Sequence, residues 1–336
     1  MKIIIDCMGG DLAPVETLKG AVLARRELGG EYILVGHEET IRATAAEQGL
    51  DISGMEILHA ESVVTMHDDA TAPVRGKKDS SMAVALRALA DGQGDAVVSC
   101  GNTGALFAGA TLIVRRIKGV HRAAIAALLP FNPPVLMLDA GANVTVRPEF
   151  LPQFATLGVA YMKSLYGMEN PRVGLLNNGA EEHKGTPIHT EAYALLSADP
   201  AINFVGNVEG NAVTQSACDV LVTDGFTGNV MLKTMEGMGK LIMKRIKGVF
   251  YTNVATKLAA LMVKKHVADV KRDFDVSEQG GSPILGLCKP VIKAHGSSDA
   301  RAFKNAIRQA IRFAESGAIA DVEAHLAATA GGGDEA

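Results

Sequence analysis

Residues 95–110 read DAVVSCGNTGALFAGA: a short apolar run, a Gly-Asn-Thr-Gly turn, and then small residues at helical spacing. This order predicts a β-strand that passes through a bare backbone loop into a helix. In an open α/β sheet such a loop lies beyond the carboxyl ends of the strands. There the backbone amides and the positive end of the helix dipole favour an anion.

The same order, an apolar run followed by a turn rich in Gly, Asn or Asp, recurs five times. Carboxyl ends of parallel strands share one edge of a sheet, so the six loops predict a single crevice lined by backbone and small polar side chains. The further loops are CMGGDLAP at 7–14, LDAGANV at 138–144, LLNNGAEEHKGTP at 175–187, VTDGFTGN at 222–229 and AHGSSDA at 294–300.

Apolar runs without polar alternation indicate strands that are covered on both faces. Helical patterns lie between them, as at 16–28 and 81–92, and this alternation predicts a three-layer α/β/α sandwich. A turn at Asn132-Pro133-Pro134 makes two of the strands antiparallel neighbours, so the sheet is mixed and mostly parallel. The runs are residues 3–5, 32–35, 55–58, 96–99, 123–129, 135–138, 173–176, 204–205 and 220–223.

Composition narrows the class of protein. The formal charge of −4 argues against a general nucleic-acid binder, and four distant cysteines without a CxxC motif suggest reduced thiols in a cytoplasm. The first apolar run is too short for a signal peptide, and no stretch approaches the ~20 apolar residues of a membrane span. We expect one α/β domain over residues 1–325 and a disordered tail over 326–336.

HKGTP at 183–187 is the sharpest local signal. Thr186 is a suitable N-cap and Pro187 a suitable first helical residue, which brings Lys184 to a helix N-terminus, where a cation calls for an anion. A solvated loop lysine is the alternative. His183 and His189 match no helical metal-ligand motif, and no metal site is predicted.

TDGFTGN at 223–229 offers side chains that can hydrogen-bond phosphate or carbonyl oxygens, namely Asp224, Thr227 and Asn229. Ordinary turn and capping duty is the alternative reading. Cys100 could be a nucleophile at a strand end, but no local motif gives it a histidine, and a small buried hydrophobe is the commoner role.

Residues 233–275 form a basic amphipathic helical segment, with ten basic residues against two acidic ones between 233 and 272. Its apolar stripe, which includes Met238 and Ile242, packs into the core or a dimer interface in one reading. In the other, an apolar tip flanked by cations contacts an anionic bilayer or an acidic protein. The residues assigned to this contact are Lys244, Arg245, Lys247, Val249, Leu261, Lys264 and Lys265.

Together the motifs resemble the bacterial phosphate acyltransferases of phospholipid synthesis, in order from Ile5 to about Ile311. Cys7 and Cys100 stand where that family usually has a small residue such as Ala. The motifs are IDCMGGDLAP at 5–14, SCGNTGA at 99–105, LDAGAN at 138–143, VGLLNNGAEEHKGT at 173–186, VTDGFTGNV at 222–230, GGSPILG at 280–286 and AHGSSDARAFKNAI at 294–307.

The resemblance implies transfer of an acyl group from acyl carrier protein to inorganic phosphate, without a cofactor. It also implies a homodimer with a fold like that of phosphotransacetylases and isocitrate or isopropylmalate dehydrogenases. The expected setting is the cytoplasm, at the surface of an anionic membrane, where a membrane glycerol-3-phosphate acyltransferase takes the product. An acetyl- or butyryltransferase that uses coenzyme A, or a non-catalytic scaffold that binds lipid or carrier protein, is the alternative.

On this basis we assign catalysis to Lys184, Asn229 and Asn102. Lys184 would screen the phosphate and the developing charge, and the two asparagines would donate hydrogen bonds to phosphate or oxyanion. The predicted substrate-binding residues are Gly101, Thr103, Gly104, Asn143, His183, Gly185, Thr186, Asp224, Gly225, Thr227, Gly228, His295, Ser297 and Ser298.

Overall fold

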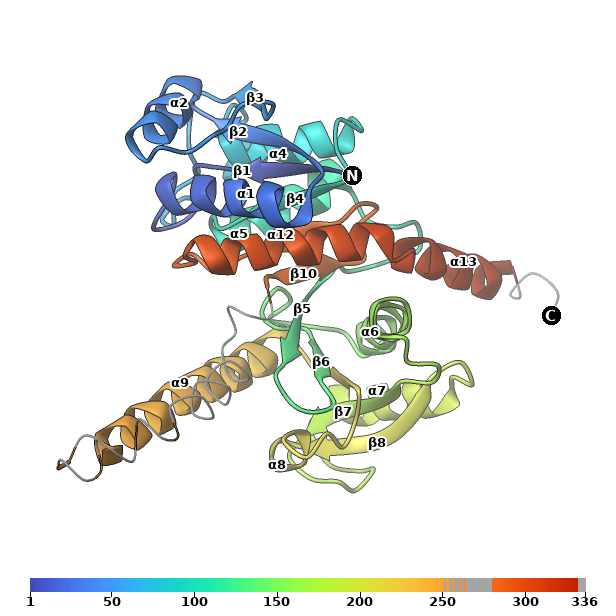
Figure 1. The fold of residues 1–336 in the computed structure, drawn as a ribbon. Helices are drawn as coiled ribbons and strands as arrows, with labels where there is room; N and C mark the ends of the chain where they lie inside the picture. The colour runs from blue at the N-terminus through green and yellow to red at the C-terminus, as the bar shows by residue number, and fades with distance from the viewer. Residues whose placement is uncertain (251, 254–255, 257–259, 261–262, 264–279, 332–336) are drawn as a thin grey trace.

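The computed structural model describes residues 1–250, 252–253, 256, 260, 263 and 280–331. At its centre lies an eleven-stranded sheet of order β3-β2-β1-β4-β11-β10-β5-β6-β9-β7-β8 (Figure 1). Every predicted apolar run contributes a strand. The strands are β1 Lys2–Asp6, β2 Glu31–Gly36, β3 Glu56–His59, β4 Ala96–Ser99, β5 Ala124–Leu129, β6 Val135–Leu138, β7 Arg172–Asn177, β8 Asn203–Glu209, β9 Val220–Val222, β10 Ser282–Leu285 and β11 Val291–Lys293.

Helices cover both faces of the sheet, which confirms the predicted α/β/α sandwich. One face buries side chains of α1 Val15–Leu28, α2 Glu38–Glu47, α6 Phe150–Tyr166, α7 Pro187–Ala198, α12 Ala300–Glu315 and α13 Ala318–Gly331. The other buries side chains of α3 Ala72–Arg75, α4 Ser81–Ala90, α5 Thr103–Gly109, the π-helix η1 Ala110–Val114 and α8 Gly210–Val213, with α9 Gly225–Phe250 packed against them.

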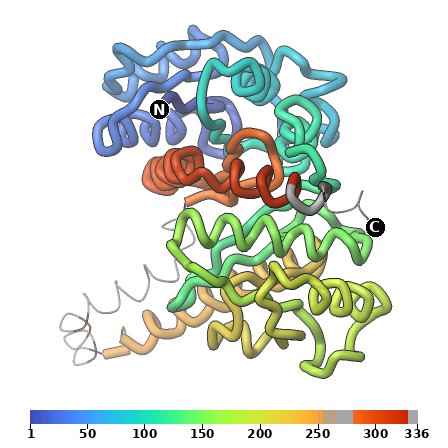
Figure 2. The backbone as a smooth tube through the Cα atoms, turned by 90° about the vertical axis from the view of Figure 1, so that its right-hand side faces the viewer, coloured from blue at the N-terminus to red at the C-terminus, as the bar shows by residue number. Residues whose placement is uncertain are grey.

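The sheet has two parallel parts that run in opposite directions. The N-terminal half consists of β3, β2, β1, β4 and β11, and the C-terminal half of β6, β9, β7 and β8. Three antiparallel pairs lie between them, and the β5–β6 pair confirms the predicted hairpin. In Figure 2, α12 lies between the two halves of the molecule.

Strand twist offsets this reversal. Neighbouring strands rotate by about 20–25°, so the six steps from β1 to β9 accumulate roughly 120–150°. Reversal and twist together turn the carboxyl ends of both halves toward one side of the molecule, the side on which α9 projects (Figure 1).

Two segment boundaries in the structure differ from the predicted ones. The predicted tail begins at residue 326, whereas α13 extends to Gly331: Leu326 packs against the core, and the Ala-rich sequence that follows favours a helix. α9 already begins at Gly225, ahead of the predicted basic segment at 233–275. Most of that segment beyond Phe250 lies outside the described residues.

Candidate functional site

The six predicted loops fall into two clusters, one at the carboxyl ends of the strands in each half of the sheet. The N-terminal cluster contains the loops after β1, β4 and β11, residues 7–14, 99–104 and 294–300. The C-terminal cluster contains the loops after β6, β7 and β9, residues 139–144, 177–187 and 223–229. In the order of the sheet, the strands β10 and β5 lie between the two sets.

A buried carboxylate orders the N-terminal cluster. Asp6 ends β1 at 1% exposure and accepts hydrogen bonds from Ser99 Oγ at 2.6 Å and from the Met8 N–H at 3.3 Å. Burial raises the pKa of Asp6, while these donors favour its charged form. Ser99 Oγ in turn accepts from the Gly101 N–H at 3.0 Å. A Cβ at Gly9 would lie 2.8 Å from the Gly101 nitrogen, so glycine is required where the loops meet.

The side chain of Asn102 is committed within this cluster. Its Oδ1 accepts from the Ala105 N–H at 3.1 Å and caps α5, as the strand–loop–helix pattern predicts. Its Nδ2 lies 3.3 Å from each of three carbonyl oxygens, those of Thr65, Met66 and Asp68. Asn102 therefore fastens the 65–68 loop to the start of α5, and its amide already has protein acceptors.

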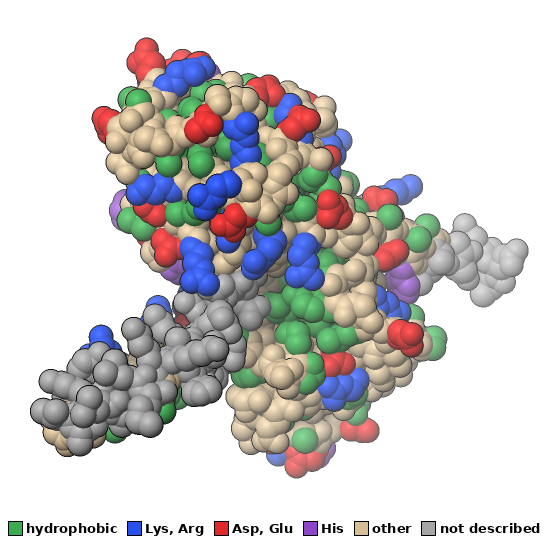
Figure 3. Space-filling view, viewed as in Figure 1, with side chains coloured by type: hydrophobic (Ala, Val, Ile, Leu, Met, Phe, Trp, Pro, Cys, Tyr) green, Lys and Arg blue, Asp and Glu red, His purple; other side chains and the backbone are tan. Residues whose placement is uncertain are grey.

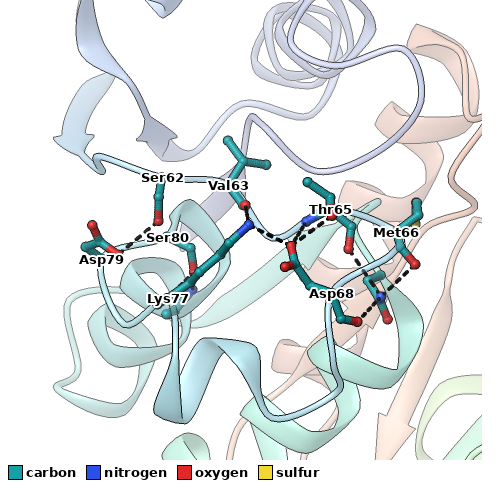
Figure 4. Close-up of polar contacts among 10 residues, drawn as sticks. Ser62, Val63, Thr65, Met66, Asp68, Lys77, Asp79 and Ser80 are labelled. Carbon is teal, nitrogen blue, oxygen red and sulfur yellow. Dashed lines mark hydrogen bonds and ion pairs between the residues drawn. The ribbon is translucent and has the colours of Figure 1, made fainter.

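Further contacts hold the same loop from its other side (Figure 4). Lys77 Nζ donates to Asp68 Oδ2 at 2.7 Å and to the Val63 carbonyl at 2.9 Å. Bonds from Lys77 and Thr65 lower the pKa of Asp68 to about 2. Lys77 thus stabilises the 65–68 loop.

The third loop of the N-terminal cluster contains three predicted site residues. The carbonyl of Gly296 accepts from the Asp11 N–H at 2.8 Å, which joins this loop to the one after β1. His295 Nδ1 lies 2.9 Å from Ser297 Oγ and accepts from the Ser297 N–H at 3.3 Å. Ser298 donates its N–H to the His295 carbonyl at 3.0 Å. The turn therefore fixes the orientation of the imidazole.

A second buried carboxylate orders the C-terminal cluster. Asp139 follows β6 at 0% exposure, and burial raises its pKa while hydrogen bonds from Ala142, Asn143 and Ile125 oppose that shift. Asn143, which is 7% exposed, supplies two of the donors and offers its carbonyl to the Gly225 N–H at 2.8 Å. The donors are the backbone N–H groups of Ile125, Gly141, Ala142 and Asn143 and the side-chain Nδ2 of Asn143.

At the start of α9, two predicted site residues act as caps and one is uncommitted. Asp224 accepts from the Thr227 N–H at 2.9 Å and from Thr227 Oγ1 at 2.7 Å, the capping duty foreseen as the alternative. Asn229 is exposed and lies against Gly141, and its side chain has no hydrogen-bond partner among the described residues. Its amide is thus available to a ligand.

The HKGTP loop has the predicted form. Thr186 is the N-cap of α7 and Pro187 its first residue, and the Thr186 N–H donates to His189 Nδ1 at 3.4 Å. The carbonyl of Lys184 accepts from Asn177 Nδ2 at 3.0 Å, whereas its half-buried side chain has no ion-pair partner in the described part of the chain. Burial lowers the pKa of His189 and nearby Asp224 raises it, so the β7 and β9 loops adjoin.

α9 connects the two clusters. Asn229 lies at its C-terminal-cluster end, and Lys233, four residues later, is close enough to Lys293 and His295 to affect both groups. Burial is the main cause of the lowered pKa of His295, and Lys233, Lys293 and Lys240 lower it further. The first three turns of α9 thus run from the C-terminal cluster to the neighbourhood of the loop after β11.

Lys293 is the residue that sequence analysis missed. It ends β11 at 9% exposure, and burial lowers its pKa. Its signal is a lysine directly after the apolar pair Val291-Ile292, at the end of a strand. Cys100, beside it, is 1% exposed, and burial raises the pKa of its thiol to about 12.

Other features of the surface do not coincide with these loops. A cavity of about 350 Å³ between the β5–β6 hairpin, α6 and α12 is lined by side chains that include Tyr161, Tyr166 and Arg312. A row of Lys and Arg side chains lies along α12 (Figure 3). Within the described residues, no three His, Cys, Asp or Glu side chains gather as a metal site. Over the same ranges, every helix is too short or too polar to cross a membrane.

Part of the predicted contact segment is described. Lys244, Arg245, Lys247 and Val249 are exposed on α9, whereas Leu261, Lys264 and Lys265 lie outside the described residues. Met238 and Ile242 are each 50% exposed, so their burial in the core of one chain is wrong. A dimer interface or an external partner remains for this stripe.

Comparison with solved structures gives the class of fold. EutD phosphotransacetylase from Staphylococcus aureus is similar with a TM-score of 0.58 at 16% identity, over 96% of this chain and 94% of that one. A phosphotransacetylase from Streptococcus pyogenes gives 0.59 at 17%, over the same shares. At these identities the likeness shows the fold alone, which is the predicted phosphotransacetylase-like α/β architecture.

Sequence comparison gives the family. The family described as "Fatty acid synthesis protein" matches residues 1–321. A "Phosphate acyltransferase" from Acetivibrio thermocellus is 47% identical over 95% of this chain and 94% of its own length, and one from Fusobacterium nucleatum is 46% identical over 94% and 96%. The chain therefore belongs to this family of phosphate acyltransferases, which confirms the resemblance found in its motifs.

Proposed function

We propose that the chain transfers a fatty acyl group from acyl carrier protein to inorganic phosphate and so supplies acyl phosphate for phospholipid synthesis. The family match over residues 1–321, with relatives named phosphate acyltransferase, carries this proposal. The uncommitted Lys184 ammonium and Asn229 amide in the C-terminal cluster support it, because the reaction needs donors that the fold has not used.

In the proposed reaction, a phosphate oxygen attacks the thioester carbonyl carbon and the carbonyl oxygen becomes an oxyanion. The C–S bond then breaks as the carbonyl re-forms, which yields acyl phosphate and a thiolate that takes a proton from water. A thiol pKa of about 8.5 makes the thiolate a good leaving group. The protein must hold two reactants together and screen negative charge.

We assign the screening of charge to Lys184 and a hydrogen bond to the oxyanion or phosphate to Asn229. Asn102 is assigned to loop positioning, because its amide already has three carbonyl acceptors. Several loop amides already donate hydrogen bonds within the protein, so the backbone amides left to bind phosphate are those of first helical turns, such as Thr103, Gly104 and Phe226. The committed N–H groups are those of Gly101, Gly225, Thr227 and Gly228.

We further infer that α9 contacts an anionic membrane or carrier protein, and that two chains form a homodimer. The exposed basic residues Lys244, Arg245 and Lys247, with the 65% exposed Val249 beside them, support a contact of this kind. The helix could then deliver acyl phosphate to a membrane glycerol-3-phosphate acyltransferase.

The test is turnover of acyl carrier protein with phosphate. Free thiol is followed with a chromogenic disulfide, and acyl phosphate is trapped with hydroxylamine. We expect thiol release that requires phosphate and matches the trapped product in amount. Faster turnover of acetyl- or butyryl-coenzyme A would favour the alternative enzyme, and no turnover of either donor would favour the scaffold.

A further inference from the structure

We propose that Lys293 and Lys233 form a second phosphate-binding subsite, where the loop after β11 meets α9. The inference rests on the proposed acyl transfer and adds a substrate contact on the N-terminal half, one helical turn from Asn229.

Lys293 has the geometry of a cation that lacks its anion. Its Nζ donates to the Ala294 carbonyl and lies 3.5 Å from the Cys100 carbonyl. An ammonium has three protons, so one remains for a ligand. No carboxylate of the described residues lies within 4.0 Å of this nitrogen. A buried ammonium with only neutral partners is unfavourable, and a bound anion would relieve that cost.

A second observation comes from the facing helix. Lys233 lowers the pKa of Lys293, and Lys233 and Lys240 both lower that of His295, so positive charge on α9 adds to that of the loop after β11. Glu236 is the acidic group of α9 that acts on His295, and it is already bonded to Lys233 at 2.9 Å.

The charge on the other side of the subsite does not pair with Lys293. Asp11 and Asp6 both act on it through space without forming an ion pair, and Asp6 is bonded to Ser99 and Met8. Lys293, with one ammonium proton free, and Lys233, which also bonds Glu236, suit a phosphate group, because phosphate accepts several charge-assisted hydrogen bonds.

The proposed reaction supplies two phosphate groups. One is inorganic phosphate, and the other is the phosphodiester of the prosthetic arm that carries the acyl thioester. Asn229 and Lys233 are neighbours on one face of α9, with about 6 Å between their Cβ atoms. A substrate can therefore reach both the Lys293 subsite and the C-terminal cluster. The kinetic experiment distinguishes the two sources.

The experiment compares Lys293→Met and Lys233→Met with the wild type. Lys289→Met is the matched control, because Lys289 also donates to a carbonyl, that of Leu89 at 2.9 Å, but on the turn before β11. Thermal shift is measured against sodium phosphate and against sodium chloride of equal ionic strength. The KM values for phosphate and for acyl carrier protein are then determined.

For inorganic phosphate, we expect both variants to lose the phosphate-specific thermal shift and to raise the KM for phosphate about tenfold or more, the effect of one charge-assisted hydrogen bond. If the subsite holds the prosthetic arm, the KM for carrier protein rises instead. Lys289→Met should leave both constants unchanged.

Unchanged KM values for both substrates in Lys233→Met and Lys293→Met would overturn the proposal. Lys293 would then only stabilise the loop that follows β11. Lys233 is exposed, so its variant remains informative if Lys293→Met does not fold, and Lys293→Arg should restore binding. If the wild type turns over no carrier protein, yet Lys293→Met and Lys233→Met abolish a phosphate-specific shift, the proposed function fails while the subsite stands.

Discussion

The two loop clusters share a buried aspartate but differ in whether their polar side chains are already hydrogen-bonded within the protein. Each contains a buried aspartate, Asp6 or Asp139, that follows a strand core and accepts hydrogen bonds from its own loop. In the N-terminal cluster the amide of Asn102 is already bonded within the protein. In the C-terminal cluster the side chains of Lys184 and Asn229 have no partner among the described residues. The same strand-and-loop pattern therefore occurs in both clusters, and we propose that the chemistry takes place where donors are left uncommitted.

The largest expected effect tests the uncommitted lysine. Lys184→Met should lower turnover by at least ~10²-fold, the scale seen when one preorganised group is removed. The fold should persist, because the Nζ group makes no bond to the described residues. Steady-state turnover and the thermal midpoint are measured together. The exposed Lys118→Met serves as control, and a near-normal rate for Lys184→Met would return Lys184 to a solvated loop lysine.

A pair of asparagines tests the comparison directly. Asn229→Ala should reduce turnover about 10–100-fold, the effect of one hydrogen bond to a charged group, without changing the free energy of unfolding, since its amide has only a ligand to lose. Asn102→Ala should lower the free energy of unfolding by about 1 kcal/mol, because it removes an N-cap. Denaturant titration and turnover are measured for both. The opposite outcome, with Asn229 stabilising and Asn102 catalytic at constant stability, would exchange the roles.

Much of this comparison could be predicted from local sequence. Apolar runs mark the strands, and Thr186-Pro187 marks the start of α7, because these signals depend on near neighbours. The separation of the loops could not be predicted in this way. It depends on the antiparallel position of β10 between β11 and β5, which are brought together from distant parts of the chain.

The hydrogen-bond partners of individual side chains could not be predicted from local sequence either. Asn102 reaches carbonyls more than thirty residues away, and Lys293 faces a helix that starts at Gly225. A residue's type and its local motif carry no information on such distant partners.

A third region, the exposed end of α9, is predicted to act in membrane contact and not in turnover, unlike the two loop clusters. Val249→Glu should abolish sedimentation with vesicles that contain an anionic lipid, while turnover in solution is unchanged, because Val249 is 65% exposed on α9, far along the helix from Asn229. Leu112→Glu, also at an exposed position, is the control. Vesicle binding that persists in Val249→Glu would favour a protein interface for this stripe.

The smallest expected effect concerns Cys100. The thiol is 1% exposed, and burial raises its pKa to about 12, so almost none of it is thiolate at neutral pH. Cys100→Ala should therefore keep most of the turnover and lower the free energy of unfolding by about 1 kcal/mol or less, as for loss of one small buried group. Iodoacetamide offers a second measurement: it should label the exposed Cys288 first and leave turnover intact. Loss of activity in Cys100→Ala with an unchanged fold would instead require a covalent acyl-enzyme, and would move the chemistry from the C-terminal cluster to the N-terminal one.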